Sequence, residues 1–362
     1  MKWYFHAIAF LFMVSSLMQP AVAIPPLPDN EGFAGMYAGV TGKYLLAAGG
    51  ANFPDGYPWE GGKKRWYRDI YSIEIENPQA WRKLPISLPH AMGYGVYGSW
   101  HDMFLIAGGE TGPTPEEPPD KPVRILNKVF AIKHEHDNFS IIQLPPLPKP
   151  LKDSCGTVVG DFLLVFGGIS DTSDTKASAE LLVLNLKNLN QGWQKGPALP
   201  APGRVQAVAA TDEKFFYIFS GIEIEADSTS KPARKMPYLT DAWRMEIGNN
   251  PMQSTWQRLP DIPAERAAAP SPAWFFNHQI AIPGGADSAR HRQPQKDHPG
   301  WSGDMLIFNT LKEKWEIRKN QFQPKQARVT APGISFQDKY VIISGEKSPG
   351  MRSPEILQLP QP

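Results

Sequence analysis

The sequence predicts an all-β fold, a six-bladed β-propeller, because one phrase recurs six times at nearly equal intervals. In each copy an apolar run rich in β-formers ends in Gly-Gly or Ser-Gly. The copies end at Gly49-Gly50, Gly108-Gly109, Gly167-Gly168, Ser220-Gly221, Gly284-Gly285 and Ser344-Gly345. The first residues of these pairs are 59, 59, 53, 64 and 60 positions apart. Such spacing is typical of repeat folds, in which each unit buries its apolar faces against its neighbours.

Residues 1–23 have the composition of a secretory signal. Lys2 supplies the positive start, Ile8 to Leu17 the apolar core, and Ala21-Val22-Ala23 a small-residue cleavage site. The apolar run is too short for a membrane-spanning helix. We therefore expect export, with residues 24–362 forming a single propeller domain. Cys155 is the only cysteine, so no internal disulfide can form, and this combination favours a periplasmic location.

The charge of the chain limits its partners. The net charge is +1, and residues of both signs are interspersed. This pattern argues against nucleic acid or an anionic membrane surface as the main partner. It favours no particular oligomeric state.

The residues that follow the signal are similar to the segments that close the repeats. Ile24-Pro25-Pro26-Leu27-Pro28 is similar to Leu144-Pro145-Pro146-Leu147-Pro148 and to Leu259-Pro260-Asp261-Ile262-Pro263. We therefore expect the N-terminal segment to complete the sheet of the C-terminal blade. A ring closed in this way leaves no exposed edge strand.

Several repeats also carry an aromatic residue at the start of the predicted fourth strand. These residues are Trp81, Trp193, Trp256 and Trp315. Together with the glycine pairs they are typical of kelch-type propellers, in which glycines allow close backbone approach and the tryptophan packs between neighbouring sheets. We assign these glycines and tryptophans to the architecture.

The loops after the glycine pairs and the residues that open each repeat share one rim of an antiparallel meander. Binding residues are expected on such loops, although an isolated loop charge is more often merely solvated. Glu346 and Arg352 are the exception, because the Pro349-Gly350 turn folds a short insert back on itself. This turn brings a carboxylate and a guanidinium together at the mouth of the central channel. An ion pair that only anchors the loop is the alternative interpretation.

These residues carry a resemblance to a known family. The stretch from Ile343 to Ser353 resembles the Gly-Glu, Pro-Gly, Arg signature of the bacterial N-acetylneuraminate epimerases, or sialic acid mutarotases. Gly49 to Phe53, followed by Glu60 to Ile70, is similar to the Gly-Gly-Ala-x-Phe and Glu-Gly-x-Lys-Lys-x-Tyr loop of that family. Arg204 to Ala207 matches its Arg-x-Gln-Ala.

The order of the motifs differs from that of the better-known family members. There the Gly-Glu…Arg stretch precedes the Gly-Gly-Ala-x-Phe stretch, whereas here it comes last. The chain is therefore identified as a member of a circularly permuted branch. A closed ring tolerates such permutation because its two ends meet within one blade.

The resemblance implies an isomerase that interconverts the α and β anomers of N-acetylneuraminate without a metal or cofactor. Glu346 would transfer protons, and Arg352 would pair with the carboxylate of the sugar. Further contacts with the sugar are expected from Arg204, Gln206, Lys63, Lys64 and Tyr67. His291 and His298 lie in the loop that follows the glycine pair of the fifth repeat. This loop belongs to the same rim, so a contact of either histidine with the substrate is a weaker expectation.

The sequence lacks the motifs of two other enzyme classes found on propeller folds. A sialidase would need Ser-x-Asp-x-Gly-x-Thr-Trp boxes, which the sequence lacks. A copper oxidase would need a Tyr-Cys pair and histidine ligands, a setting that neither Cys155 nor His134-x-His136 has. A non-catalytic kelch propeller that binds a glycan or a protein remains the alternative, because propellers host many functions.

Overall fold

The computed structural model describes residues 23–230, 234–336 and 338–360, and nearly all regular structure in these residues is β. The predicted signal peptide, residues 1–23, lies outside the described residues except for Ala23. Nowhere in the described ranges does a helix have the length and apolar character needed to cross a membrane.

Six antiparallel sheets dominate the described chain, five with four strands and one with three. Taken sheet by sheet, they comprise β1 (Tyr37–Thr41), β2 (Tyr44–Ala48), β5 (Asp69–Glu74) and β6 (Arg82–Ser87); β8 (Val96–Trp100), β9 (Met103–Ala107), β12 (Val129–Glu135) and β13 (Asn138–Gln143); β14 (Cys155–Val159), β15 (Phe162–Phe166), β16 (Leu181–Asn185) and β17 (Trp193–Lys195); β19 (Val208–Thr211), β20 (Phe215–Phe219), β24 (Ala242–Glu246) and β25 (Trp256–Leu259); β26 (Trp274–Phe276), β27 (Gln279–Pro283), β28 (Met305–Asn309) and β29 (Lys314–Arg318); and β30 (Gly333–Phe336), β31 (Lys339–Ile343) and β34 (Ile356–Pro360). The second strand of each sheet is the apolar run that ends in a predicted Gly-Gly or Ser-Gly pair.

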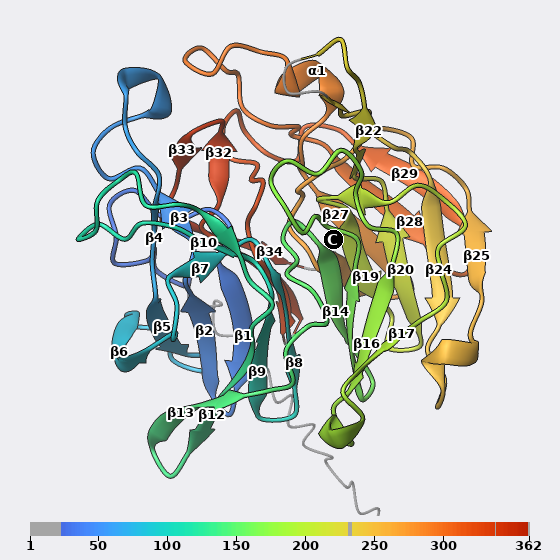
Figure 1. The fold of residues 1–362 in the computed structure, drawn as a ribbon, viewed down its shortest axis with the longest axis horizontal. Helices are drawn as coiled ribbons and strands as arrows, with labels where there is room; N and C mark the ends of the chain where they lie inside the picture. Colours follow the sequence, from blue (N-terminus) through green and yellow to red (C-terminus); the bar gives the residue numbers. More distant parts are fainter. Residues whose placement is uncertain (1–22, 231–233, 337, 361–362) are drawn as a thin grey trace, which may run out of the picture.

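Smaller elements lie in the connections between these strands. They are β3 (Ala51–Asn52), η1 (Pro58–Glu60), β4 (Arg65–Trp66), β7 (Met92–Gly93), β10 (Glu110–Thr111), β11 (Arg124–Ile125), η2 (Leu189–Gln191), β18 (Arg204–Val205), β21 (Ile222–Glu223), β22 (Glu225–Ala226), β23 (Arg234–Lys235), η3 (Pro251–Gln253), α1 (Ser288–His291), β32 (Glu346–Ser348) and β33 (Met351–Arg352). Figure 1 shows β3, β10, β22, β32 and α1 toward one end of the sheets and the β12–β13 hairpin at the other. The loops that follow the glycine pairs therefore share one rim, as the meander predicts.

A closed ring of six backbone hydrogen bonds joins the sheets around the axis. Its members are Gly35, Tyr94, Asp153, Gln206, Ala268 and Thr330, which precede the first strands of successive sheets and all have positive φ. The amide of each donates to the carbonyl of the member before it, and the amide of Gly35 donates to Thr330, with N–O distances of 2.7 to 3.0 Å. The all-β propeller fold is thus confirmed, and the six-membered ring supports the predicted number of blades.

The N-terminal segment covers the last sheet in the place where other repeats end. The amide of Leu27 donates to the carbonyl of Pro354, and the amide of Leu147 donates in the same way to the carbonyl of Asn127 in the second repeat. The Trp81 indole donates to Pro25, just as Trp193, Trp256 and Trp315 donate to Pro145, Pro197 and Pro260.

These residues nevertheless add no fourth strand to the sheet of β30, β31 and β34. Pro25, Pro26 and Pro28 lack the amide hydrogens that a strand ladder requires. The segment therefore closes the blade mainly by packing Ile24 and Leu27 into its core. The expectation of a completed sheet was too strong, and the circular permutation stays a prediction.

Buried arginines hold three of the repeats together. Arg204, Arg266 and Arg328 lie near the start of successive repeats, and each is at most 2% exposed. Arg204 donates to both carboxylate oxygens of Asp241, at 2.5 and 2.8 Å, and to the carbonyls of Pro202 and Ser220. Although burial alone would raise it, these bonds hold the pKa of Asp241 below its usual value. The arrangement serves the fold and does not support the predicted contact of Arg204 with the sugar.

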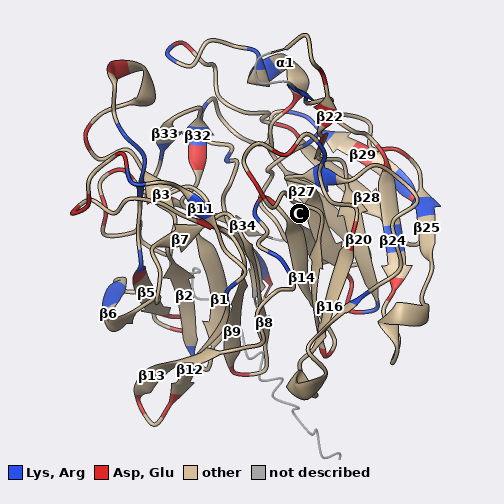
Figure 2. Cartoon of the chain, in the orientation of Figure 1, with Lys and Arg blue, Asp and Glu red and all other residues tan. Residues whose placement is uncertain are grey.

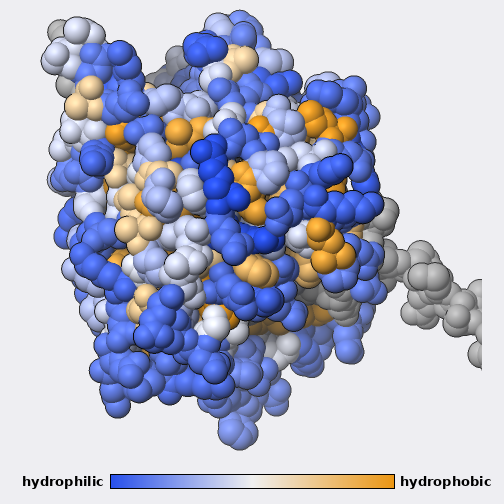
Figure 3. All heavy atoms as spheres, turned by 90° about the vertical axis from the view of Figure 1, so that its right-hand side faces the viewer, coloured by the Kyte–Doolittle hydropathy of each residue, from blue (hydrophilic) through white to orange (hydrophobic). Residues whose placement is uncertain are grey.

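The surface carries little continuous apolar area on the face shown in Figure 3. Hydrophilic residues cover most of that face, and the apolar groups between them are small. Figure 2 shows the charged positions mainly on loops and outer strands, with the inner strands largely uncharged. Charged side chains are therefore found mainly on the loops and the outer strands.

We expect Leu27→Ala to lower the free energy of unfolding by about 2 to 5 kcal/mol, the usual range for truncating a buried leucine. Leu27 is 3% exposed and packs in the cluster that contains Val341 and Ile343. Denaturant unfolding measures the effect. Leu311→Ala is the matched control because Leu311 is 71% exposed. Equal stability of the two variants would show that the N-terminal segment is not part of the core.

Arg204→Met should lower the free energy of unfolding by about 3 to 5 kcal/mol, because it leaves the buried Asp241 carboxylate without its partner. The difference from the parent protein should shrink as pH falls, because stability that depends on a carboxylate with a lowered pKa is lost on its protonation. Arg258→Met removes an exposed partner of Asp261 and should cost less than about 1 kcal/mol. A comparably small effect at Arg204 would return that residue to the list of possible ligand contacts.

Candidate functional site

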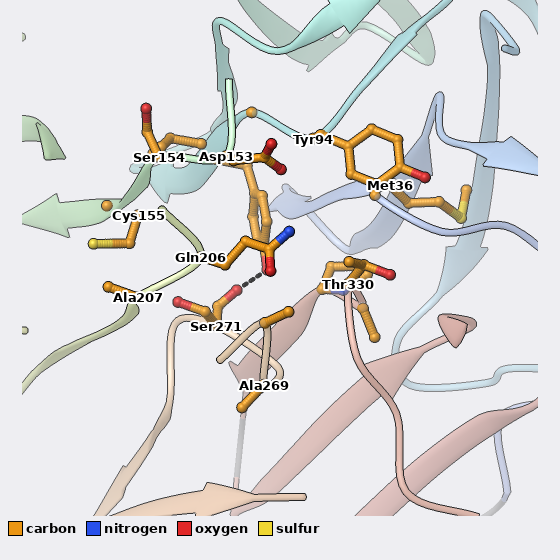
Figure 4. Close-up of a pocket in the computed structure, with 18 residues that line it drawn as sticks. Met36, Tyr94, Asp153, Ser154, Cys155, Gln206, Ala207, Ala269, Ser271 and Thr330 are labelled. Atoms are coloured by element: carbon orange, nitrogen blue, oxygen red, sulfur yellow. Dashed lines mark hydrogen bonds between the residues drawn. The ribbon is translucent and has the colours of Figure 1, made fainter. Parts of the chain in front are cut away.

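A pocket opens at the axis, lined by the six members of the hydrogen-bonded ring and by residues next to them. Figure 4 shows the side chains of Tyr94, Asp153, Gln206 and Thr330 around it. Gly35 and Ala268 complete the ring with little or no side chain. The wall of the pocket is therefore polar at four of the six ring positions, and it includes Gln206 as predicted.

Tyr97 is one of the residues that line this pocket. It also lines a second cavity, whose other lining residues include Ser99, Thr157 and Glu213. Its hydroxyl donates to the carbonyl of Ser271 and accepts a hydrogen bond from the amide of Gly333 at 3.1 Å. These bonds fix the tyrosine between blades, so that it separates the axial pocket from the cavity beyond it.

Glu346 and Arg352 face each other across the β32–β33 ribbon. Oε2 of Glu346 lies 3.0 Å from Nη1 of Arg352, an ion-pair distance, but the two groups are not aligned as a hydrogen bond. Arg352 is 8% exposed, and neither its Nε nor its Nη1 has a hydrogen-bond partner among the described residues. The pair is thus assembled as predicted and is largely shielded from bulk water, although neither residue is among those that line the axial pocket. The guanidinium keeps donors without hydrogen-bond partners among the described residues.

The backbone places this pair next to the axial ring. Glu346 exchanges two hydrogen bonds with Val329, the residue before the ring member Thr330. The guanidinium of Arg352 lies over the ring of Phe53, with 4.5 Å between its carbon and the ring centre. Gly350 packs so closely on the η1 loop that an added Cβ would come within 2.8 Å of Pro58. Two motifs almost 300 positions apart in the sequence therefore form one structure.

A second charged cluster lies beside the pocket. Glu110 binds Lys64 at 2.9 Å and Lys152 at 2.7 Å. Burial would raise its pKa, but the two ammonium groups hold the pKa of Glu110 below the usual value. The Lys64 ammonium also lies 4.0 Å from the ring centre of Tyr94. Lys64 thus contacts Tyr94 of the pocket wall but does not itself line the pocket.

The structure does not bring Lys63 or Tyr67 into the pocket. Lys63 is exposed, and neither residue is among the described residues that line the pocket. Tyr67 packs edge-on against Phe33, with ring centres 4.9 Å apart, and burial raises its pKa to about 12. Their predicted contacts with the sugar therefore have no geometric support here.

Sequence reasoning missed Tyr94 and Asp153 as site residues. Asp153 gave only a positional signal, because it stands where Gln206 stands in its own repeat, just before the first strand. Tyr94 occupies the same place and also opens a stretch, up to Thr111, that resembles the epimerase family. The Asp153 side chain is 16% exposed and lies 3.6 Å from Lys152. Burial, and to a lesser degree the charge of Glu110, raise the pKa of Asp153, while Lys152 opposes the shift. A carboxyl group of this kind can hold a proton that an exposed one would lose.

The two histidines of the fifth repeat lie in contacts within the rim. His298 is buried, accepts a hydrogen bond from the amide of Gly300 through Nδ1, and lies 3.0 Å from the carbonyl of Arg290 through Nε2. Burial lowers the pKa of His298, while the contact with the Arg290 carbonyl opposes this shift. His291 bonds to the Tyr238 hydroxyl. Neither histidine lines the axial pocket, and no cluster of three or more potential metal-ligating residues occurs in the described chain.

Comparison with known proteins links this architecture to named relatives. A protein of Yersinia pestis (strain Pestoides F) named N-acetylneuraminate epimerase is 37% identical over 91 residues, which is 23% of this chain and 22% of the relative. One of the same name from Haemophilus influenzae (strain PittEE) is 24% identical over 238 residues, covering 59% of this chain and 58% of the relative. A Kelch domain-containing protein of Vibrio cholerae is 23% identical over 240 residues, covering 59% of this chain and 62% of the relative. No family model matches the chain.

The solved structures give the fold over a greater length. The protein in "Structure of YjhT" superposes with a TM-score of 0.68 at 14% identity, covering 93% of this chain and 97% of that one. The chain spans between about a fifth and three fifths of the curated relatives it matches in sequence. The resemblance that the motifs indicated is therefore confirmed: the chain is a homologue of proteins named N-acetylneuraminate epimerase and has the propeller fold of YjhT.

Proposed function

We propose that the protein interconverts the α and β anomers of N-acetylneuraminate in the axial pocket, without a metal or cofactor. The observation that carries the proposal is the Glu346–Arg352 pair, which lies out of bulk water beside the pocket of an epimerase homologue. A periplasmic location after removal of residues 1–23 is part of the proposal. The substrate would be a free sugar acid.

The free donors of Arg352 support binding of the sugar carboxylate. Its Nε and Nη1 are buried without hydrogen-bond partners in the described residues, an arrangement that costs free energy unless a ligand accepts from them. A carboxylate supplies both charge and acceptors. Phe53 supports the guanidinium from one face and restricts how it can turn. The Gln206 amide in the wall can donate to and accept from the hydroxyl and acetamido groups of a sugar.

The chemistry needs only proton transfer. A base removes the proton of the anomeric hydroxyl, the oxygen forms the carbonyl of the open chain, and the ring C–O bond breaks as its oxygen gains a proton. Rotation about the freed carbon and the reverse steps give the other anomer. Glu346 would act as the base, since its carboxylate lies beside the guanidinium that would hold the sugar carboxylate on the anomeric carbon.

Glu346→Gln should slow the catalysed equilibration of freshly released α-N-acetylneuraminate by about 10²-fold or more, the scale of general acid–base catalysis. Proton NMR follows the two anomers with time. Glu316→Gln is the matched control, because Glu316 is an exposed residue of β29 paired with Arg318, and it should keep the parent rate. If the unaltered protein binds the sugar but does not accelerate its equilibration, the non-catalytic binding function replaces this proposal.

A further inference from the structure

Ring opening requires a second proton-transfer group, because one proton leaves the anomeric hydroxyl while another arrives at the ring oxygen. We propose that Asp153 is this second group and acts as the acid from the side of the pocket opposite Glu346. The inference rests on the proposed function and adds a catalytic residue that no motif of the sequence indicated.

The hydrogen-bonded ring fixes where the two carboxyl groups lie. Asp153 is its third member and Thr330 its sixth, so the two stand across the axis from each other. Glu346 is held to the residue before Thr330 by two backbone hydrogen bonds. A sugar over the axis, with its carboxylate toward Arg352, therefore has Glu346 on one side and Asp153 on the other.

The surroundings of Asp153 leave its carboxyl group directed at the pocket. Asp153 lines the pocket, and Figure 4 shows its carboxyl group between the side chains of Tyr94 and Gln206. Its backbone has φ of 54°, a left-handed conformation that costs free energy for a residue other than glycine and is held here by the ring bonds on both sides. The strained backbone conformation thus occurs at the residue whose side chain lines the pocket.

Burial favours the protonated form of Asp153, and the charged groups around it oppose this only in part. Lys152 on the same segment lies 3.6 Å away, but its ammonium group also pairs with Glu110 of β10 at 2.7 Å, and Glu110 binds Lys64, which precedes β4, at 2.9 Å. The carboxylate of Glu110 therefore offsets part of the effect of the two ammonium groups on Asp153. Tyr94 and Gln206 are the other polar neighbours, and burial is the largest cause of the raised pKa of Asp153.

The proton inventory balances with these two groups. On opening, Glu346 takes the hydroxyl proton, and the O–H electrons form the carbonyl. The electrons of the broken C–O bond remain on the ring oxygen, which takes the proton of Asp153. On reclosure the new hydroxyl of the chain returns its proton to Asp153, and Glu346 protonates the new anomeric oxygen. Each carboxyl group ends in the state in which it began.

The test compares Asp153→Asn with Asp161→Asn in the equilibration assay between about pH 4 and pH 8, with the spontaneous rate subtracted at each pH. Asn tolerates a left-handed backbone, so the ring should survive the substitution. Asp161 lies in the β14–β15 turn, pairs with Lys187 and is the matched control. We expect about a 10²-fold loss for Asp153→Asn and none for the control.

The parent protein should also lose catalysed rate as pH rises through the pKa of Asp153, because an acid that has lost its proton cannot donate one. This alkaline decline should be absent from the residual activity of Asp153→Asn. If Asp153→Asn fails to fold, the profile of the parent protein decides: an alkaline decline supports the inference, and a rate independent of pH overturns it.

The outcomes separate this inference from the function on which it rests. A fully active Asp153→Asn protein, alongside an inactive Glu346→Gln protein, would overturn the role of Asp153 and leave the proposed function intact. A parent protein that does not accelerate equilibration would overturn both. Thermal unfolding of each variant confirms that the rates are those of folded protein.

Discussion

The ring of six backbone hydrogen bonds around the axis is the constraint on which the rest of the structure depends. Each bond joins the segment before one first strand to its counterpart in the next sheet, and the last returns to Gly35. Because the bonds run from one repeat to the next, no sheet can move along the axis without breaking two of them. The apolar faces of neighbouring sheets are thereby held in the register at which their core clusters pack.

The same ring creates the pocket. A left-handed residue turns the chain sharply, so that its amide and carbonyl lie in the ring while its side chain stands at the wall. Only glycine adopts this conformation without cost, yet five of the six members are other residues, and four of these are the polar residues Tyr94, Asp153, Gln206 and Thr330. Strain of this kind persists where the surrounding structure enforces it, and it concentrates at functional sites. The choice of polar residues over glycine at these positions is an argument for function that is independent of any motif.

The repeat length and the glycine pairs were sufficient to predict the fold from the sequence, because close backbone approach and strand period depend on local residue types. The Pro349-Gly350 turn and the family resemblance singled out Glu346 and Arg352, whose short insert forms its own ribbon. The predicted contact of Arg204 with the sugar stays a prediction without geometric support, and its buried partner Asp241 lies 37 positions away and leaves no local signal in the sequence. Asp153 was missed for the related reason that its importance comes from a ring whose other members lie in other repeats.

Three glutamates lie within two residues of a closing glycine, and their partners decide what each can do. Glu110 is held by two lysines, which take both of its carboxylate oxygens and leave it no freedom to exchange a proton with a ligand. Glu223 pairs through its backbone with Arg204, whose guanidinium is already committed to Asp241. Glu346 alone of the three stands beside a guanidinium that has unused donors. A ligand that satisfies Arg352 through its carboxylate would free Glu346 from that ion pair at the moment the anomeric hydroxyl arrives, so binding itself would prepare the base.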